Sequence, residues 1–125
     1  MKIKLVNIIT LMIVSFFTLV GCSDERYSAA ELIEIGKEAI EKMEYDKAVS
    51  FFQEARKKGI NDGEVNKLIN IINDYKEAIK QYNAKRYEVS KEILSNIDED
   101  YIKYQIRIDI GYLKNLTNGN NNLNN

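Results

Sequence analysis

Apolar side chains recur at helical spacing along residues 28–115, and this pattern most constrains the fold of the chain. Residues three and four apart lie on one face of a helix, whereas a β-sandwich needs frequent turn signals between short strands. The 125 residues include no proline, which would break a helix interior, and only six glycines. We therefore predict an all-α domain built from antiparallel helical hairpins.

Signals for helix starts and ends divide this domain into five predicted helices. Ser28 and Glu31 have the spacing of a capping box, in which each side chain satisfies a backbone N–H of the first turn. Gly59 marks the end of the second helix, because glycine readily adopts the left-handed conformation there. Asp62 marks the start of a long third helix. A turn at residues 83–86 precedes the fourth helix.

The fifth predicted helix, residues 101–115, also fits a strand pattern. Its apolar side chains alternate strictly with polar ones, at Ile102, Tyr104, Ile106, Ile108, Ile110 and Tyr112. A broad helical face through Ile102, Ile106, Ile110 and Leu113 is the alternative. A lone strand would have no sheet to join and would leave its edges unpaired, so we predict a helix. Residues 116–125 are polar and rich in asparagine, and we expect them to be disordered.

The N-terminal residues have the pattern of a secretory signal. Lys2 and Lys4 provide a basic start, and a mainly apolar run extends from Leu5 to Val20. This run is shorter than the roughly 20 apolar residues that a spanning helix needs. Polar and acidic residues follow it directly. We therefore predict that residues 1–21 are a signal peptide.

The end of this segment, Leu19-Val20-Gly21-Cys22, resembles the lipobox of bacterial lipoproteins. The resemblance implies transfer of diacylglycerol to the Cys22 thiol and cleavage between Gly21 and Cys22. The mature protein would then be lipid-anchored on the extracytoplasmic face of the cell membrane, with residues 22–27 as a tether. An ordinary cysteine after an uncleaved anchor is the alternative.

Charge argues against two other means of attachment. The chain has 18 basic and 19 acidic side chains, and removal of residues 1–21 removes two lysines, so the mature chain has 16 − 19 = −3. A negative net charge disfavours electrostatic binding to anionic lipids or to nucleic acid. The basic pairs Lys57-Lys58 and Lys85-Arg86 are too short for a nucleic-acid surface. The lipid on Cys22 is therefore the predicted contact with the membrane.

Two predicted helix pairs are related by an internal repeat. Tyr45 and Tyr87 each open the second helix of a pair, and 87 − 45 gives an offset of 42 residues. At this offset Ala48 aligns with Ser90 and Phe52 aligns with Leu94.

The first pair resembles a tetratricopeptide repeat, and the second is a weaker match. The positions that carry the resemblance are Leu32, Ile35, Gly36, Tyr45, Ala48, Phe52 and Ala55. The resemblance implies about two repeats over residues 29–98 plus a C-terminal capping helix. The offset exceeds the family's repeat of about 34 residues, which predicts a third helix extended at its start. A bundle of helical hairpins without a superhelical groove is the alternative.

In tetratricopeptide-like arrays the first helix of each pair lines a concave face, which implies a partner-binding groove. The residues placed there are Ile33, Lys37, Ile40, Glu41, Ile72, Tyr75, Lys76, Ile79, Tyr82 and Asn83. Tyr75 and Tyr82 are suitable anchors, because tyrosine combines a large apolar area with a polar tip. Alternatively, the stripe that contains them is core beneath the last helix, since apolar stripes normally face the core.

Composition excludes most catalytic chemistry. The chain has no histidine and a single cysteine, which removes histidine acid–base catalysis, cysteine–histidine metal sites and an internal disulfide. The acidic run at residues 98–100 fits a helix start. We predict no enzyme activity, no cofactor and no metal, and a role in binding another protein or a peptide. A small-ligand or cation binder with a pocket between hairpins is the alternative.

Overall fold

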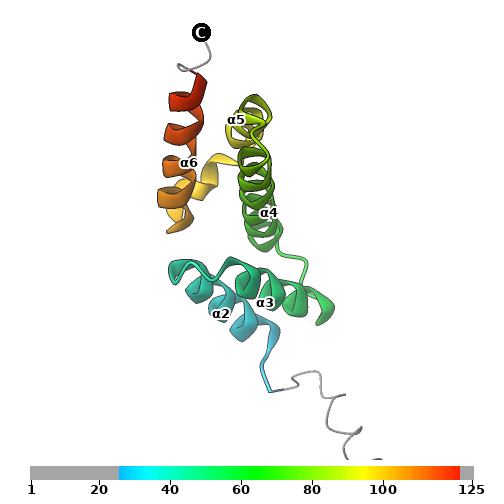
Figure 1. The fold of residues 1–125 in the computed structure, drawn as a ribbon. Helices are drawn as coiled ribbons and strands as arrows, with labels where there is room; N and C mark the ends of the chain where they lie inside the picture. Colours follow the sequence, from blue (N-terminus) through cyan, green and yellow to red (C-terminus); the bar gives the residue numbers. More distant parts are fainter. Residues whose placement is uncertain (1–25, 122–125) are drawn as a thin grey trace, which may run out of the picture.

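The computed structural model describes residues 26–121, which form five α-helices and one short 3₁₀ helix (Figure 1). In chain order they are α2 (Ala29–Glu41), α3 (Tyr45–Lys57), α4 (Gly63–Asn83), α5 (Tyr87–Asn96), η1 (Glu99–Lys103) and α6 (Ile106–Asn121). No strand is present among these residues. The prediction of an all-α fold of helical hairpins is confirmed. The predicted signal peptide and the Leu19–Cys22 motif lie outside the described residues.

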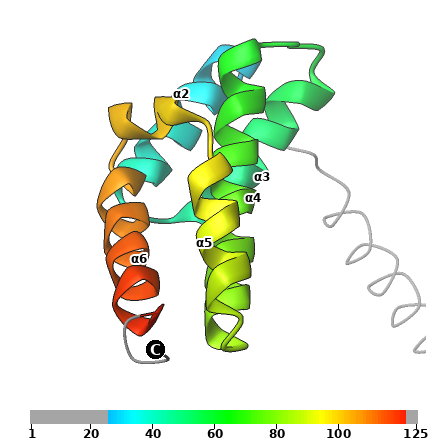
Figure 2. The ribbon, with the colours of Figure 1, turned by 90° about the horizontal axis from the view of Figure 1, so that it is seen from above.

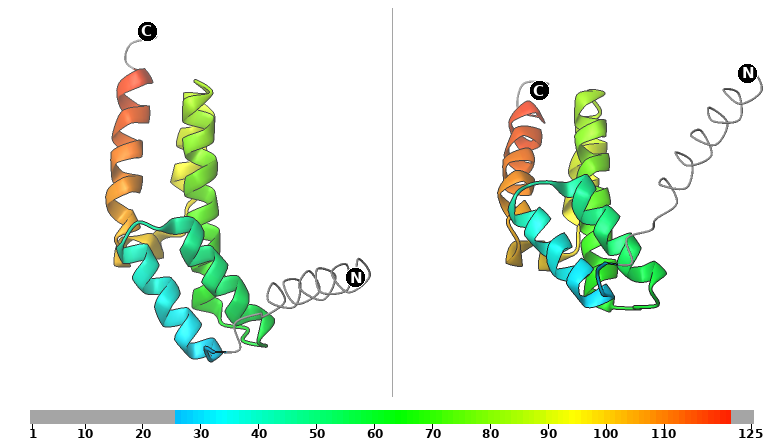
Figure 3. Two further views of the ribbon diagram at one scale, coloured as in Figure 1. Left: turned by 60° about the horizontal axis from the view of Figure 1, so that its bottom comes forward. Right: turned by 90° about the horizontal axis from the view of Figure 1, so that it is seen from below.

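The helices form two antiparallel hairpins and a final helix. Helices α4, α5 and α6 lie alongside one another, and the α2–α3 hairpin lies across the N-terminal end of α4 (Figures 1 and 2). The start of α6 lies beside the turn of the α2–α3 hairpin (Figure 3). The last helix therefore contacts both hairpins, because it packs along α5 and α4 and begins next to α2.

The capping box predicted at the start of α2 is present. The Glu31 backbone N–H donates to the Ser28 hydroxyl at 3.2 Å, and the Ser28 backbone N–H donates to the Glu31 carboxylate at 2.7 Å. These bonds satisfy two donors that have no partner within the helix. They fix where the domain begins after the N-terminal segment.

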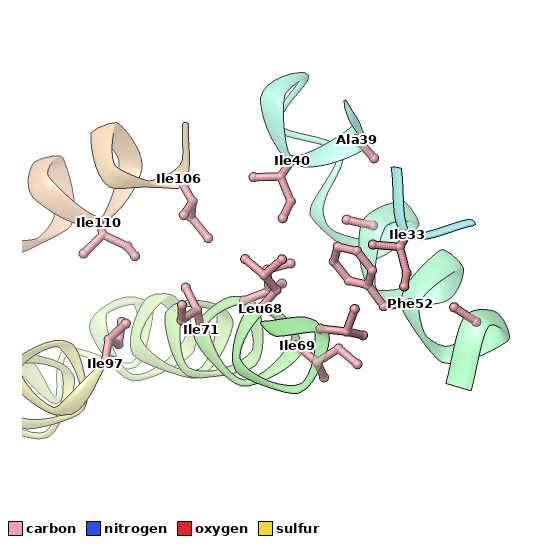
Figure 4. Close-up of a cluster of buried hydrophobic side chains, with 14 of the residues drawn as sticks. Ile33, Ala39, Ile40, Phe52, Leu68, Ile69, Ile71, Ile97, Ile106 and Ile110 are labelled. Carbon is pink, nitrogen blue, oxygen red and sulfur yellow. The ribbon is translucent and has the colours of Figure 1, made fainter. Parts of the chain in front are cut away.

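One hydrophobic core joins the two hairpins to α6. Ile40 of α2, Leu68 of α4 and Ile106 of α6 converge, and each is at most 1% exposed (Figure 4). Phe52 of α3 and Ile69 of α4 extend this cluster between the hairpins. Burial of these side chains is the main force that holds the crossed hairpins together.

A glycine allows the two helices of the first hairpin to approach. The ring of Phe52 packs directly on Gly36, and a Cβ atom at position 36 would lie 2.5 Å from Phe52 Cε1. Phe52 is fully buried. Position 36 therefore requires glycine because the aromatic ring occupies the space of a side chain.

The turns of the two hairpins have the same conformation. Met43 and Lys85, which are 42 residues apart, have φ angles of 59° and 60°. The Glu44 N–H donates to the Ala39 carbonyl at 2.8 Å, and the Arg86 N–H donates to the Gln81 carbonyl at 2.9 Å. The two hairpin turns thus repeat at the predicted offset. The repeat includes the left-handed residue, which the sequence comparison did not identify.

The first helix of the second hairpin is extended at its start, as predicted. Helix α4 has 21 residues and α2 has 13, and the two helices end at equivalent positions, Asn83 and Glu41. The additional residues are 63–70. They include Val65, Leu68 and Ile69, which are buried in the core.

The predicted boundaries of the last helix were wrong at both ends. Residues 99–103 form the 3₁₀ helix η1, and Tyr104 is extended, with φ −122° and ψ 162°. Tyr104 Oη donates to Glu64 Oε1 at 2.5 Å, so the break lets this side chain contact the start of α4. Ile102, expected on the buried face, is 60% exposed.

At its C-terminal end α6 continues to Asn121, so the prediction of a disordered tail is wrong for residues 116–121. Thr117 lies in this part of the helix, and its side chain is buried, with 1% exposed. The Asn120 side-chain amide donates to Tyr82 Oη at 3.0 Å. These tertiary contacts stabilise a polar segment whose composition alone favours disorder. Residues 122–125 lie outside the described part.

Candidate functional site

The predicted groove residues mostly face other helices. Ile33, Ile40 and Ile72 belong to the core, and their exposed fractions are 8%, 0% and 0%. Ile79 is partly buried against the same core, whereas Asn83 is exposed at the end of α4. The aliphatic members of the set therefore supply packing between helices.

The charged members of the set form contacts between elements. Lys37 Nζ of α2 lies 3.0 Å from Glu64 Oε2 at the start of α4, and Lys76 of α4 pairs with Asp46 of α3. The Glu41 carboxylate accepts a long hydrogen bond of 3.4 Å from the backbone N–H of Gln105, just before α6. These side chains link the first hairpin to the rest of the domain.

The two predicted tyrosine anchors are also engaged inside the molecule. The ring of Tyr75 packs edge-on against Tyr45 with centroids 5.7 Å apart. Tyr82 packs against Tyr87 at 5.2 Å, and its hydroxyl accepts from Asn120. Both are only partly exposed. The prediction of an open groove with these residues at its floor needs correction, because the side chains serve contacts between helices.

Polar side chains also join the first hairpin to α4 and α6. We call this boundary between the elements the seam, and its polar members include Tyr45, Asp109, Lys37, Glu64 and Tyr104. The Tyr45 hydroxyl donates to the Asp109 carboxylate of α6, and burial together with this bond raises the pKa of Tyr45. The hydrogen bond from Tyr104, and next the bond from Lys37, lower the pKa of Glu64. These contacts therefore favour neutral tyrosines and an ionised Glu64.

An exposed apolar patch lies on the outer side of α6. Ile108 and Tyr112, one turn apart, are 50% and 66% exposed, and on the opposite side Ile106 and Ile110 are fully buried. Large exposed apolar side chains that are neighbours on a helix are a feature of interaction surfaces. We name Ile108 and Tyr112 the α6 patch.

Sequence reasoning did not identify the α6 patch, although a signal for it was present. The alternation of residues 102–112 has more apolar positions than one helical face can bury. Once this segment is a helix, its apolar residues must point in two directions. The excess of apolar residues could therefore have indicated an exposed face.

The described part of the chain has hollows beside its helices, and two of them concern the prediction of a pocket between hairpins. One, of about 230 Å³, lies between α5 and α6 and is lined by Lys91, Leu94, Ser95, Lys114, Thr117 and Asn118. The other, of about 410 Å³, is a shallow depression beside the start of α2, lined by Tyr27, Ala30, Glu31, Glu34 and Ile35.

Two further findings concern metals and membranes. Residues 26–121 contain no group of three or more acidic, histidine or cysteine side chains that could hold a metal ion. Within the same residues, no helix has the length and apolar character needed to cross a membrane. Cys22, the predicted lipidation site, and Gly21 lie outside the described range.

Comparison with known proteins gave no relative: no family model, curated protein or solved structure matches the chain. The resemblances to bacterial lipoproteins and to tetratricopeptide repeats therefore stay predictions from the residues quoted above. The shared turns and the offset of 42 residues are properties of this chain.

Proposed function

We propose that this protein is a lipoprotein, anchored through Cys22 to the extracytoplasmic face of a cell membrane, whose helical domain binds another protein or a peptide. Support for the anchor comes from the basic start, the apolar run and the Leu19–Cys22 motif. The only cysteine of the chain stands where that motif requires a thiol.

The exposure of the α6 patch is the observation that carries the binding proposal. Tyr112 is 66% exposed and Ile108 is 50% exposed, although the rest of α6 offers polar residues for its outer side. An aromatic side chain beside an aliphatic one can anchor a partner, because both lose apolar surface to water on binding. Because Tyr75 and Tyr82 are partly buried in contacts between helices, the proposed contact moves from the predicted groove to this patch.

The anchor is tested by the variant Cys22→Ala. We expect the native protein in the membrane fraction with a mass increased by lipid and reduced by loss of residues 1–21. The variant should lack the lipid and lose stable membrane attachment, because the acyl chains on Cys22 are the predicted contact with the membrane. A native protein whose mass shows residues 1–21 still attached and no lipid would contradict the anchor.

Partner binding is tested by chemical cross-linking in intact cells. We expect a partner that cross-links to the native protein and is lost from the double variant Ile108→Ser, Tyr112→Ser. Val89→Ser is the matched control, since Val89 of α5 is 42% exposed and lies outside the α6 patch. A partner retained by the double variant would rule out the α6 patch as the contact surface.

A further inference from the structure

The hollow between α5 and α6 brings two lysine side chains to one place. Lys91 comes from α5 and Lys114 comes from α6, and both line the space of about 230 Å³. Buried Leu94 lines it as well. No acidic side chain is among the residues that line it. Two lysine side chains therefore line one partly enclosed space that has an apolar wall.

Most of the other lysines of the described chain pair with a carboxylate. Seven of them have a carboxylate oxygen within 4.0 Å, namely Lys37, Lys47, Lys57, Lys67, Lys76, Lys80 and Lys103. Within residues 26–121, neither Lys91 nor Lys114 has such a partner. The two lysines of the hollow thus lack the internal counter-charge that most lysines here have.

Neighbouring side chains position Lys114. Its Nζ lies 4.8 Å from the centroid of the Tyr101 ring and 3.1 Å from Tyr101 Oη. This cation–π contact holds the ammonium group without neutralising its charge. The hydroxyl of buried Thr117 donates to the Lys114 carbonyl at 2.9 Å, which fixes the helix turn beneath it. The Nζ of Lys114 is therefore held in place by Tyr101.

Asn118 adds an amide that can donate to a ligand. Its side chain lines the hollow, whereas the Ser95 hydroxyl already donates to the Glu92 carbonyl at 2.7 Å. Two ammonium groups and one amide suit an oxygen-rich anion, which accepts several hydrogen bonds at once. The volume is below the range of about 300–1,000 Å³ that holds drug-sized ligands, so the space fits a small group.

We propose that the α5–α6 hollow binds a small oxyanion, a carboxylate or a phosphate, between the ammonium groups of Lys91 and Lys114. Such a group would supply the counter-charge that the described chain does not provide. The apolar wall would exclude water from one side of the ion and strengthen the attraction. This inference does not rest on the proposed function, because it uses neither Cys22 nor the α6 patch.

The test uses the full chain in a nonionic detergent and two probes, sodium phosphate and sodium acetate, each at constant ionic strength. Backbone amide shifts are followed by ¹⁵N NMR. We expect saturable shifts that centre on residues 91–95 and 114–118 with at least one probe. Saturation by phosphate alone identifies a phosphate site, and saturation by acetate alone identifies a carboxylate site.

Variants separate a built site from general screening of charge. Lys91→Gln, at an exposed position, should weaken binding about tenfold, and Lys91→Gln combined with Lys114→Gln should abolish it. Lys114→Arg retains the charge and should retain binding. Lys42→Gln is the control, because Lys42 is exposed at the C-cap of α2 and, like Lys91, has no carboxylate partner among the described residues. Absence of saturable shifts with both probes, or equal effects of Lys42→Gln and Lys91→Gln, would overturn the proposal.

Discussion

The α2–α3 and α4–α5 hairpins have the same turn, but they pack their helices differently. At the offset of 42 residues, Gly36 corresponds to Ala78 and Phe52 corresponds to Leu94. In the first hairpin an aromatic ring lies on a glycine, whereas the second has an aliphatic side chain and an alanine. Ala78 and Leu94 are both buried, so the second hairpin has a larger residue where the first has glycine and a smaller one where the first has phenylalanine.

The second hairpin also contains a hydrogen bond that the first cannot form. The Ser90 hydroxyl, fully buried, donates to the Ala78 carbonyl at 2.8 Å. The equivalent residue of the first hairpin is Ala48, which has no hydroxyl. A hydrogen bond of this kind contributes about 1 kcal/mol, while the larger buried area of Phe52 favours the first hairpin. The same turn conformation therefore connects two helix pairs whose buried contacts differ.

The two hairpins differ as well in what covers them. Residues 63–70 of α4 have no counterpart in α2, and they supply the buried side chains that face the first hairpin. The second hairpin is covered by α6 along its length (Figure 2). The inserted residues thus allow the hairpins to cross instead of stacking as equal neighbours.

The largest expected effect tests whether the two interiors form one cooperative unit. Phe52→Ala should lower the free energy of unfolding by about 3–5 kcal/mol and Leu94→Ala by about 2–5 kcal/mol, because each leaves a cavity. Urea unfolding followed by circular dichroism gives both values. We expect a single transition in each variant, since the core is continuous. Separate melting of α2–α3 in Phe52→Ala would show that the hairpins are independent.

The next effect tests the close approach at Gly36. Gly36→Ala should lower the free energy of unfolding by about 1–3 kcal/mol, because the new Cβ would overlap the Phe52 ring. Gly111→Ala is the control, since nothing lies within 4 Å of a Cβ at that helical position. There alanine should stabilise by about 0.5–1 kcal/mol, as in an ordinary helix. Stabilisation by both substitutions in thermal unfolding would contradict the observed contact.

A smaller effect tests the identity of the two turns. Met43→Gly and Lys85→Gly should each stabilise the protein by about 0.5 kcal/mol, because glycine adopts a positive φ without steric cost. The two gains should agree, since the φ angles are 59° and 60°. Lys42→Gly should instead destabilise, because φ at Lys42 is −91°. Opposite signs at Met43 and Lys85 would mean that the turns differ in solution.

The smallest effect concerns Glu64, which links the added part of α4 to the first hairpin. Its pKa in the folded protein is below the ordinary value of 4.5, so the ionised form adds stability above about pH 4.5. This stability is lost as the pH falls through the lowered pKa. Glu64→Gln should remove that part of the acid dependence between about pH 7 and about pH 3, measured by urea midpoints. An unchanged pH profile would show that the contacts with Lys37 and Tyr104 do not form in solution.

Local signals in the sequence predicted the starts of the early helices. The start and the end of α6 depend instead on tertiary contacts. Ser28, Glu31 and Asp62 fix helix starts through contacts with their own first turns, so neighbouring residues suffice to identify them. The start of α6 depends instead on contacts of Tyr104 with Glu64, 40 residues away in the chain. Residues 116–121 are helical because Thr117 and Asn120 pack on other elements.

The candidate site was predictable only in part. The motif ending at Cys22 consists of adjacent residues, so it can be identified without the fold, and it stays a prediction. The groove was placed on Tyr75 and Tyr82 by resemblance, and these tyrosines instead contact Tyr45, Tyr87 and α6. Which of two apolar faces is covered depends on the neighbouring helix, and helical periodicity does not specify that neighbour.

The sequence by itself determined the helical class, the hairpin repeat of 42 residues and the long third helix, because spacing, caps and turns act over a few residues. Only the tertiary structure decided that the hairpins cross, that the predicted groove is a seam, and that Ile108 and Tyr112 are exposed. It also brought Lys91 and Lys114 together. The physical reason is that burial is shared among residues distant in the chain, and their pairing depends on how whole helices pack.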